Sequence, residues 1–367
     1  MVQFLLEAAS QRRARVGVRV ALAFILLLTP AWAARVQKQK SVVLPPDLLL
    51  EGNRKLVFER SFESEKEVRG KPGFWAKVLN VVAGEPSYKR MARPYSIAVD
   101  SHGRAIVTDA DMRGVHIFDF AQHKYKFLQR WDKRKDPMLT PQCVALDAQD
   151  NIYVTDSDSG KIFVFDANGK FQRVIGSLKG GEGFFKRPTG IAVDSAAQRI
   201  YVTDTLRDEV FVLDMAGSVL NVIGRRGTGN GEFNLPTEVL LHDHKLYVVD
   251  AMNFRVEIFD TDGAFRASIG KIGDGVGTMF RPKGISFDSE GHLYVVDAYF
   301  GMVQVFNSEG QLLYYFGKRG TALGQFQLPS GIFIDHNDRV FVVDSYNSRV
   351  QVFHYFGHGK QASGEGN

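Results

Sequence analysis

Six aspartates stand at nearly regular intervals along this chain of 367 residues, each at the end of a short run of β-branched and aromatic residues. Carboxylates can act as general acids, general bases or metal ligands. Catalysis, however, needs one group that departs from its equivalents, and six copies at one register indicate a structural task. An aspartate at a strand end accepts hydrogen bonds from turn N–H groups, and we expect that role for Asp109, Asp156, Asp204, Asp250, Asp297 and Asp344.

The other nucleophiles and metal ligands form no catalytic set that their spacing reveals. Cys143 is the only cysteine, which excludes an intrachain disulfide and a cysteine-based zinc site. No neighbour in the sequence would activate its thiol, so we expect inert packing. His242 and His244 flank Asp243 and could bind a metal ion. They fall in a turn where the other repeats carry a second aspartate series, namely Asp100, Asp147, Asp194, Asp288 and Asp335.

These residues belong to six repeats. Each repeat begins with a run of the form Pro-x-Gly-Ile-Ala-Val-Asp, and the prolines are 46 to 48 residues apart. A second run, ending in one of the six aspartates, follows, and then a third run and a weaker fourth. The prolines are Pro94, Pro141, Pro188, Pro236, Pro282 and Pro329.

Each repeat thus holds four short β-rich runs, separated by turns in which Gly or Asn supplies a positive φ. No long helical periodicity intervenes, which disfavours a parallel sheet with crossover helices. Four strands in a repeat of about 40–50 residues are typical of a propeller blade. We therefore predict an all-β fold, a six-bladed β-propeller of four-stranded antiparallel blades.

The sixth repeat lacks a fourth run, but residues 56–62 match the fourth-run pattern upstream of the first repeat. We predict that this N-terminal strand completes the last blade and closes the ring, which removes an open sheet edge. Residues 71–84 carry apolar residues at helical spacing, with Pro72 and Gly84 as plausible first-turn and C-cap residues. They predict a short helix, which either caps the propeller or docks a partner or membrane.

Residues 1–33 have the form of a signal peptide, with arginines, an apolar run from Val20 to Leu28, and Ala31 and Ala33 in a small-x-small cleavage pattern. Without them, the formal net charge of +5 falls to +2, since 42 basic and 40 acidic residues remain. Global charge then gives no reason to expect a nucleic-acid partner. We predict an exported, periplasmic or extracellular protein. Association with the envelope or membrane, through an uncleaved signal or a partner, stays open as an alternative.

The remaining boundaries follow from these elements. A flexible segment is expected over residues 34–54, and the closing strand and short helix over 55–92. The propeller itself is expected over 93–357, followed by a disordered tail at 358–367. We expect the propeller to be a monomer.

The repeated runs together resemble the NHL repeat, over about residues 93–356. Its third element is matched most closely by Asn253–Val256 and Asn347–Val350, whereas Ser159–Ile162 and Phe300–Val303 depart from it. The resemblance implies a six-bladed propeller. It implies no single function, because NHL-type propellers serve as protein-binding platforms, RNA-binding domains and, more rarely, lyases.

Enzymes that resemble NHL propellers, such as the amidating lyases, hold zinc with several histidines on the central top face. The matching positions are the two residues after each proline, and none of them is histidine here. They are Tyr95-Ser96, Gln142-Cys143, Thr189-Gly190, Thr237-Glu238, Lys283-Gly284 and Ser330-Gly331. We therefore expect no cofactor, with a structural calcium ion in the channel as the open alternative.

Positions that vary among the repeats are those that can specify a ligand. The predicted channel mouth carries Tyr95, Gln142, Glu238 and Lys283, with Cys143 nearby. Aromatic and arginine residues in the loops on the same face are typical of a protein-interaction surface. These additional binding candidates are Arg113, Arg207, Phe254, Tyr299, Phe300 and Tyr346.

The sequence thus favours an exported, non-enzymatic propeller that binds a protein or peptide through its top face, as a scaffold. The alternative is a metal-assisted lyase or hydrolase at the channel mouth, using Glu238 and Gln142. A carbohydrate or other small ligand on the aromatic face is a third hypothesis.

Overall fold

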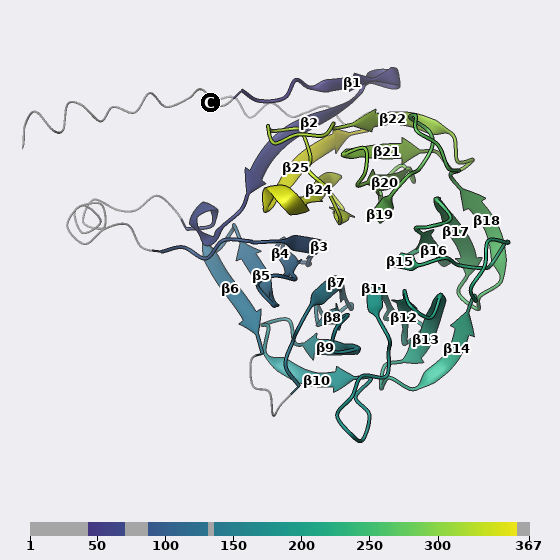
Figure 1. Ribbon diagram of the computed structural model, residues 1–367. Helices are drawn as coiled ribbons and strands as arrows, with labels where there is room; N and C mark the ends of the chain where they lie inside the picture. The colour runs from purple at the N-terminus through teal and green to yellow at the C-terminus, as the bar shows by residue number, and fades with distance from the viewer. Residues whose placement is uncertain (1–42, 70–86, 131–135, 358–367) are drawn as a thin grey trace, which may run out of the picture. The chain divides into compact units, whose positions relative to one another are not determined.

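The computed structural model describes residues 43–69, 87–130 and 136–357. The predicted signal peptide, the predicted helix at 71–84 and the C-terminal tail lie outside these residues. The unit that spans Leu44–Asn367 contains six antiparallel sheets arranged as blades around a central channel (Figure 1). The predicted six-bladed β-propeller is confirmed.

The blades are numbered along the chain, and their strands run from the channel outwards. Blade 1 comprises β3 (Pro94–Val99), β4 (Ala105–Asp109), β5 (Gly114–Asp119) and β6 (Lys124–Gln129). Blade 2 comprises β7 (Pro141–Leu146), β8 (Ile152–Asp156), β9 (Lys161–Phe165) and β10 (Phe171–Ile175). Blade 3 comprises β11 (Pro188–Asp194), β12 (Arg199–Asp204), β13 (Glu209–Asp214) and β14 (Val219–Ile223). Blade 4 comprises β15 (Pro236–His242), β16 (Lys245–Asp250), β17 (Arg255–Asp260) and β18 (Phe265–Ile269).

Blade 5 comprises β19 (Pro282–Phe287), β20 (Leu293–Asp297), β21 (Met302–Phe306) and β22 (Leu312–Phe316). Blade 6 comprises β23 (Ile332–Ile334), β24 (Arg339–Asp344), β25 (Arg349–Phe356), β2 (Arg54–Phe62) and β1 (Leu48–Leu50). Three short 3-10 helices complete the described elements: η1 (Glu51–Asn53), η2 (Glu65–Glu67) and η3 (Ser345–Asn347). In this part of the chain, no helix is long and apolar enough to cross a membrane.

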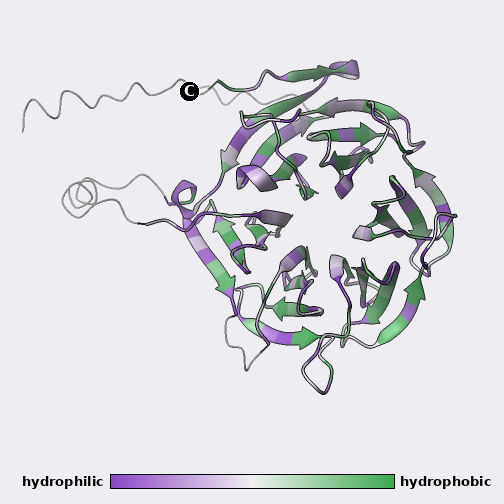
Figure 2. Ribbon diagram, viewed as in Figure 1, coloured by the Kyte–Doolittle hydropathy of each residue, from purple (hydrophilic) through white to green (hydrophobic). Residues whose placement is uncertain are grey.

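The second and third strands of each blade are buried on both faces because neighbouring blades pack face to face. Strands β4, β8 and β20, for example, are buried throughout. Each of six hydrophobic clusters joins two adjacent blades. The outermost strands instead alternate in exposure, as in β6 and β22, and Figure 2 shows alternating colours along the outer strands. The sequence therefore encodes blades that need both neighbours.

Strand β2 closes the ring, as predicted, by pairing antiparallel with β25 from Lys55 opposite Phe356 to Phe62 opposite Val350. Beyond it, β1 pairs with β2 as a fifth strand. The segment expected to be flexible, 34–54, therefore contains a short strand and the turn η1.

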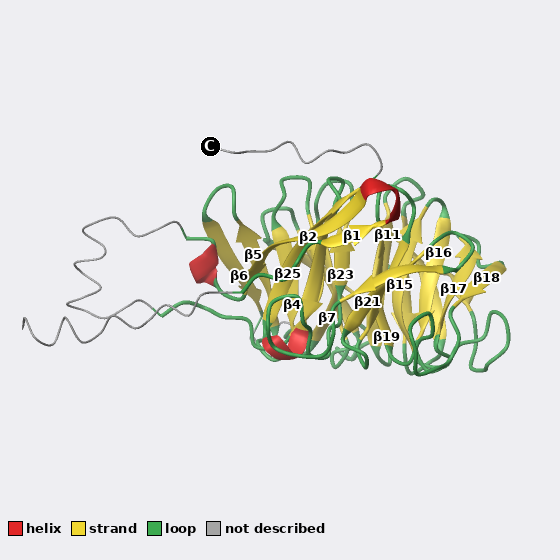
Figure 3. Cartoon of the chain, turned by 90° about the horizontal axis from the view of Figure 1, so that it is seen from above, coloured by secondary structure: helices red, strands yellow, loops and turns green. Residues whose placement is uncertain are grey.

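The two ends of the blades form distinct faces, seen edge-on in Figure 3. We call the top face the one formed by the linkers that enter the innermost strands and by the loops between second and third strands. The loops between first and second strands, and between third and fourth strands, form the bottom face.

The six aspartates at the ends of the second strands have the structural role predicted for them. In every blade, the carboxylate accepts a backbone N–H of the linker that enters the first strand, at 2.6–2.8 Å. Asp297, for example, accepts the N–H groups of Phe280 and Arg281, and also those of Tyr299 and Phe300 in the next loop. Each aspartate thus fixes where the innermost strand begins.

The second aspartate series caps the turns on the bottom face. Asp100 accepts the N–H groups of His102 and Arg104 at 3.0 and 2.9 Å, and each equivalent aspartate likewise accepts two N–H groups of its own turn. His242, which interrupts the series, stacks on Phe287 with ring centroids 3.9 Å apart. Its position is accounted for by packing.

Blade 4 carries a carboxylate where blades 5 and 6 carry an amide. Gln304 accepts the N–H of Gly277 and donates to the Thr278 carbonyl, and Gln351 makes equivalent bonds. Glu257 likewise accepts the N–H of Gly231, but its Oε2 is buried without a hydrogen-bond partner among the described residues. Burial raises the pKa of Glu257 to about 7, although Arg255 opposes the shift.

Replacing the closing phenylalanine tests how far the ring depends on β2. Phe62 is buried between the last and first blades, with ring centroids 5.0 and 5.1 Å from those of Phe118 and Phe120. We expect Phe62→Ala to lower the free energy of unfolding by about 3–5 kcal/mol, measured by chemical denaturation. Phe58→Ala, on the same strand but less buried, should cost clearly less. Equal losses would contradict a special role for this contact.

Glu257→Gln should stabilise the protein only at higher pH. In the folded state Glu257 keeps its proton up to about pH 7. The stability that the protonated Glu257 side chain contributes is therefore present at low pH and is lost as the pH rises through that value. Glutamine supplies the missing donor permanently, and we expect a gain of roughly 1–3 kcal/mol at about pH 8 and almost none at about pH 5. A gain of the same size at both pH values, in denaturation experiments, would refute this explanation.

Candidate functional site

The central channel is lined by one equivalent position from each innermost strand, the second residue after the proline. In blades 3, 5 and 6 this residue is glycine, as the repeat prescribes, and the neighbouring backbone leaves no space for a side chain. A Cβ on Gly190 would lie 2.6 Å from the Cα of Glu238, and one on Gly331 would lie 2.7 Å from the Tyr95 carbonyl oxygen. The other three blades carry side chains here, Ser96, Cys143 and Glu238.

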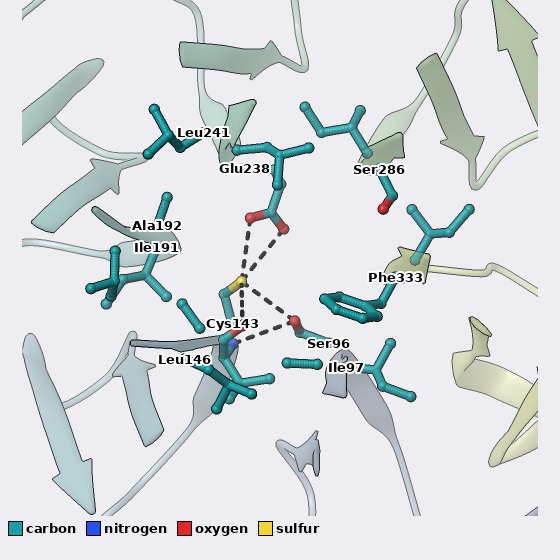
Figure 4. A pocket seen from close by; sticks show the side chains of 18 of the residues that line it. Ser96, Ile97, Cys143, Leu146, Ile191, Ala192, Glu238, Leu241, Ser286 and Phe333 are labelled. Carbon is teal, nitrogen blue, oxygen red and sulfur yellow. Dashed lines mark hydrogen bonds between the residues drawn. The ribbon is translucent and has the colours of Figure 1, made fainter. Parts of the chain in front are cut away.

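These three side chains are connected across the channel, and we call them the channel network (Figure 4). The Cys143 Sγ lies 3.4 Å from the Ser96 Oγ and donates to the Glu238 Oε1 at 3.3 Å. Blades 2 and 4 are not adjacent, and Gly190 of the intervening blade leaves room for the Cys143–Glu238 contact. The structure therefore gathers the three departures from the glycine pattern into one cluster.

Threonines from the second strands hold the inner strands of blades 1 to 3 in place. Thr108 and Thr155 accept the backbone N–H groups of Ser96 and Cys143 at 3.0 Å, and each also donates to a carbonyl of the next blade. Blades 4 to 6 carry valine at this position. The channel network is thus anchored through buried hydroxyl groups on one side of the ring.

The surroundings of the channel network favour the neutral, protonated forms of Glu238 and Cys143. Burial raises the pKa of Glu238 to about 7, against smaller opposing effects from the Cys143 thiol and the Lys283 ammonium. Burial, reinforced by the Glu238 charge, raises the pKa of the Cys143 thiol well above its ordinary value. Cys143 is therefore a poor nucleophile here, consistent with the inert packing expected for it.

Above the network lies the channel mouth, where Tyr95, Glu238 and Lys283 line one narrow cleft with Thr237 and Ser330. The structure thus brings together three of the four residues predicted at this point. Burial, and then the positive charges of Arg281 and Arg187, lower the pKa of Lys283 to about 8. Burial and the Glu238 charge raise the pKa of Tyr95, so its hydroxyl stays protonated.

Below the network, the channel widens into a cavity of about 480 Å³. All six innermost strands line it, mainly with aliphatic and aromatic side chains such as Leu146, Leu241 and Phe333. Ser96, Cys143 and Glu238 stand at the boundary between this apolar cavity and the polar mouth.

A second candidate surface lies on the top face, between blades 4 and 5. We call it the aromatic cluster, consisting of Phe254, Phe280, Tyr299 and Phe300. The ring of Phe280 lies 4.4 Å from that of Tyr299 and 6.0 Å from that of Phe254, and Tyr299 packs edge-on against Phe300. Phe280 and Tyr299 are 41% and 45% exposed. The structure therefore brings three predicted binding residues together and adds Phe280.

The remaining predicted residues lie apart from both sites. Gln142 uses its backbone carbonyl to accept from Thr108 and does not line the cleft at the mouth. Arg113 lines a separate hollow between blades 1 and 2. Arg207 packs over Phe184 and donates to its carbonyl, so this side chain is engaged within blade 3. Tyr346 is 60% exposed on blade 6, outside the aromatic cluster.

Sequence reasoning missed Ser96 as a member of the channel network and Phe280 as a member of the aromatic cluster. Ser96 had a readable signal, because it replaces glycine at the repeat position shared with Glu238 and Cys143. Phe280 lies in a linker before Pro282, where the repeat pattern is weakest, and its sequence context gave no comparable signal.

Among the described residues, one group holds three metal-ligating side chains close together, namely Asp100, His102 and Asp150 on the bottom face. The Ser101 hydroxyl and N–H already bind the Asp150 carboxylate at 2.6 and 3.2 Å. Ser289 binds Asp338 in the same way between blades 5 and 6. The repetition indicates a link between adjacent blades rather than a metal site.

The thiol of Cys143 offers a direct test of the channel network. Glu238→Gln removes a negative charge beside the thiol, which should lower the Cys143 pKa and raise its alkylation rate by iodoacetamide several-fold at about pH 8. Mass spectrometry of the intact protein measures the rate. Glu257→Gln removes a similarly buried carboxylate from outside the network and should leave the rate unchanged. Identical rates for both variants would contradict the electrostatic coupling.

Comparison with known proteins supports the fold. A family model described as a 6-bladed beta-propeller matches residues 142–198, 192–239 and 234–313. A model of the NHL repeat matches residues 326–353. No curated protein matches the sequence.

Several solved structures share the architecture at low sequence identity. A virginiamycin B lyase from Staphylococcus aureus is 13% identical, with a TM-score of 0.54, covering 82% of this chain and 99% of its own. A gluconolactonase from Xanthomonas campestris is 16% identical (TM-score 0.55, covering 86% and 99%). An auxiliary nutrient binding protein from Bacteroides thetaiotaomicron is 12% identical (TM-score 0.57, covering 72% and 69%). These likenesses concern the fold alone, and together with the two family models and the six sheets they show a six-bladed β-propeller whose last blade carries an NHL repeat.

Proposed function

We propose that this protein is a non-enzymatic binding module that docks a segment of a partner protein on its top face, against the aromatic cluster. The observation that carries the proposal is the exposure of large apolar side chains on this face. Phe280, Tyr299 and Met252 are 41%, 45% and 49% exposed, in three consecutive top-face segments of blades 4 and 5. Exposed aromatic residues within a polar surround are typical of interaction sites.

The aromatic cluster is preorganised by contacts within the propeller. The Arg319 guanidinium lies 5.1 Å from the centre of the Tyr299 ring and also donates to the Tyr299 carbonyl. Asp297 fixes the backbone on both sides of the cluster, at Phe280 and at Tyr299. A surface that is ordered in advance loses less conformational entropy when a partner binds.

The charges of the same face suggest the chemistry of the partner. Lys186, Arg187 and Arg281 are exposed there, and their side chains form no ion pair with the described residues. A partner segment that combines apolar and acidic side chains would complement this surface. The signal-like residues 1–33 support a location for this complex outside the cytoplasm, at the cell envelope.

The alternative of a metal-assisted lyase or hydrolase at Glu238 has less support. The Glu238 carboxylate accepts a hydrogen bond from the Cys143 thiol and interacts electrostatically with the Lys283 ammonium. Arg187 and Arg281 add positive charge at the same channel mouth. A metal cation would have to enter this positive environment. Gln142, its suggested second ligand, does not line the cleft.

Two substitutions in the aromatic cluster test the proposal. Affinity capture with the tagged full-length chain from its native envelope would supply a partner, whose binding to the purified chain is then measured directly. We expect Phe280→Ala combined with Tyr299→Ala to weaken that binding by about tenfold or more, because both rings would form the centre of the contact.

The matched control lies on the outer edge of the same blade. Leu313 and Tyr315 on β22 are 46% and 45% exposed, and their double alanine variant removes similar apolar surface away from the top face. It should bind the partner as the unmodified chain does. Equal weakening by the two double variants, or no weakening by the first, would overturn the assignment of this surface.

A further inference from the structure

Lys283 is half-buried at the channel mouth, and no described residue pairs directly with its ammonium group. Its side chain extends from the start of β19 into the cleft formed by Tyr95, Glu238, Thr237 and Ser330. Within the described residues, no side chain or carbonyl forms a hydrogen bond or ion pair with its ammonium group. A half-buried ammonium that has no acceptor among the protein groups can gain a charge-assisted hydrogen bond from an external acceptor.

The surroundings of Lys283 increase this demand for negative charge. Arg281, just before β19, and Arg187, just before β11, both act on it electrostatically, and among the described residues the Glu238 carboxylate opposes them. The same two arginines act on Tyr95, which also faces the Cys143 thiol. Arg93, at the equivalent position of blade 1, is instead neutralised by Asp111 at 2.7 Å. Two of the three equivalent arginines are thus left uncompensated beside the mouth.

We infer that the channel mouth is a binding site for the anionic group of a small molecule, with Lys283 as its direct contact and Arg187 and Arg281 as supporting charges. A carboxylate or a phosphate group has the required charge and acceptor atoms. The Tyr95 hydroxyl lines the same cleft and can donate a hydrogen bond to such a group. This site is separate from the aromatic cluster, and its test needs no protein partner.

The protonation states of Glu238 and Lys283 make anion binding at this site depend on pH. Glu238 becomes negative as the pH rises through about 7, and Lys283 loses its charge as the pH rises through about 8. Both changes disfavour an anion, so binding should weaken steadily from about pH 6 to about pH 9. By linkage, a bound anion raises the pKa of both groups, and the protein must therefore take up protons on binding near neutral pH.

Isothermal titration calorimetry of the full-length chain tests this inference, with succinate and inorganic phosphate as separate probes. We expect saturable binding of at least one probe at about pH 6, weakened about tenfold or more at about pH 9. Titrations in buffers of different ionisation enthalpy should reveal proton uptake at about pH 7.5. The probe that binds more tightly distinguishes a carboxylate ligand from a phosphate ligand. Absence of binding by both probes at every pH would overturn the inference.

Three substitutions make the test specific. Lys283→Met should abolish binding, whereas Lys283→Arg should retain it and keep it up to about pH 9, because arginine stays charged. Glu238→Gln should strengthen binding above about pH 7, since it removes the opposing charge. Lys271→Met, in the exposed linker before the same blade, is the control and should change nothing. Binding that survives Lys283→Met unchanged, or that Glu238→Gln weakens, would contradict the assigned roles.

Discussion

The hydrogen bonds that six buried aspartates accept from the linkers of their own blades are the interaction on which the rest of this structure depends. Each carboxylate fixes the N–H groups just before a proline, and so determines the residue at which an innermost strand starts. Because side chains alternate along a strand, a shift of one residue would turn every channel-facing group away. The aspartate at the end of each second strand therefore determines which side chains of the innermost strand face the channel.

Against this regular frame, the chemistry of the molecule comes from the places where blades differ. Three blades keep glycine beside the channel, which lets their backbones approach closely, and the other three contribute Ser96, Cys143 and Glu238. Lys283 directly precedes Gly284, the channel glycine of blade 5. A ring of six identical blades would carry the same residue at every channel position. The residues that differ between blades instead give this channel a charged mouth and an apolar cavity.

The repeats made the ring and the role of the aspartates predictable, because the same runs recur six times in the sequence. They also made the closing strand predictable, because the fourth run that the sixth repeat lacks is found upstream of the first repeat. They also predicted that Tyr95, Glu238 and Lys283 share the channel mouth, since register alone places them there. Contacts that depend on side-chain direction were not predictable: Arg207 turns onto Phe184, and Phe280 joins Tyr299 from a linker. Strand β1 follows no repeat pattern and was missed for the same reason.

The closing pair of strands has a consequence for how the chain is made. Strand β2, residues 54–62, is synthesised before any blade, yet its partner β25, residues 349–356, is synthesised last. Blades 1 to 5 can form from local segments as they emerge, whereas the sixth requires a contact across almost the whole propeller. Strand β2 can pair with β1 as soon as both have emerged, but its other edge, which β25 occupies in the folded protein, must stay unpaired until nearly the whole propeller has been translated.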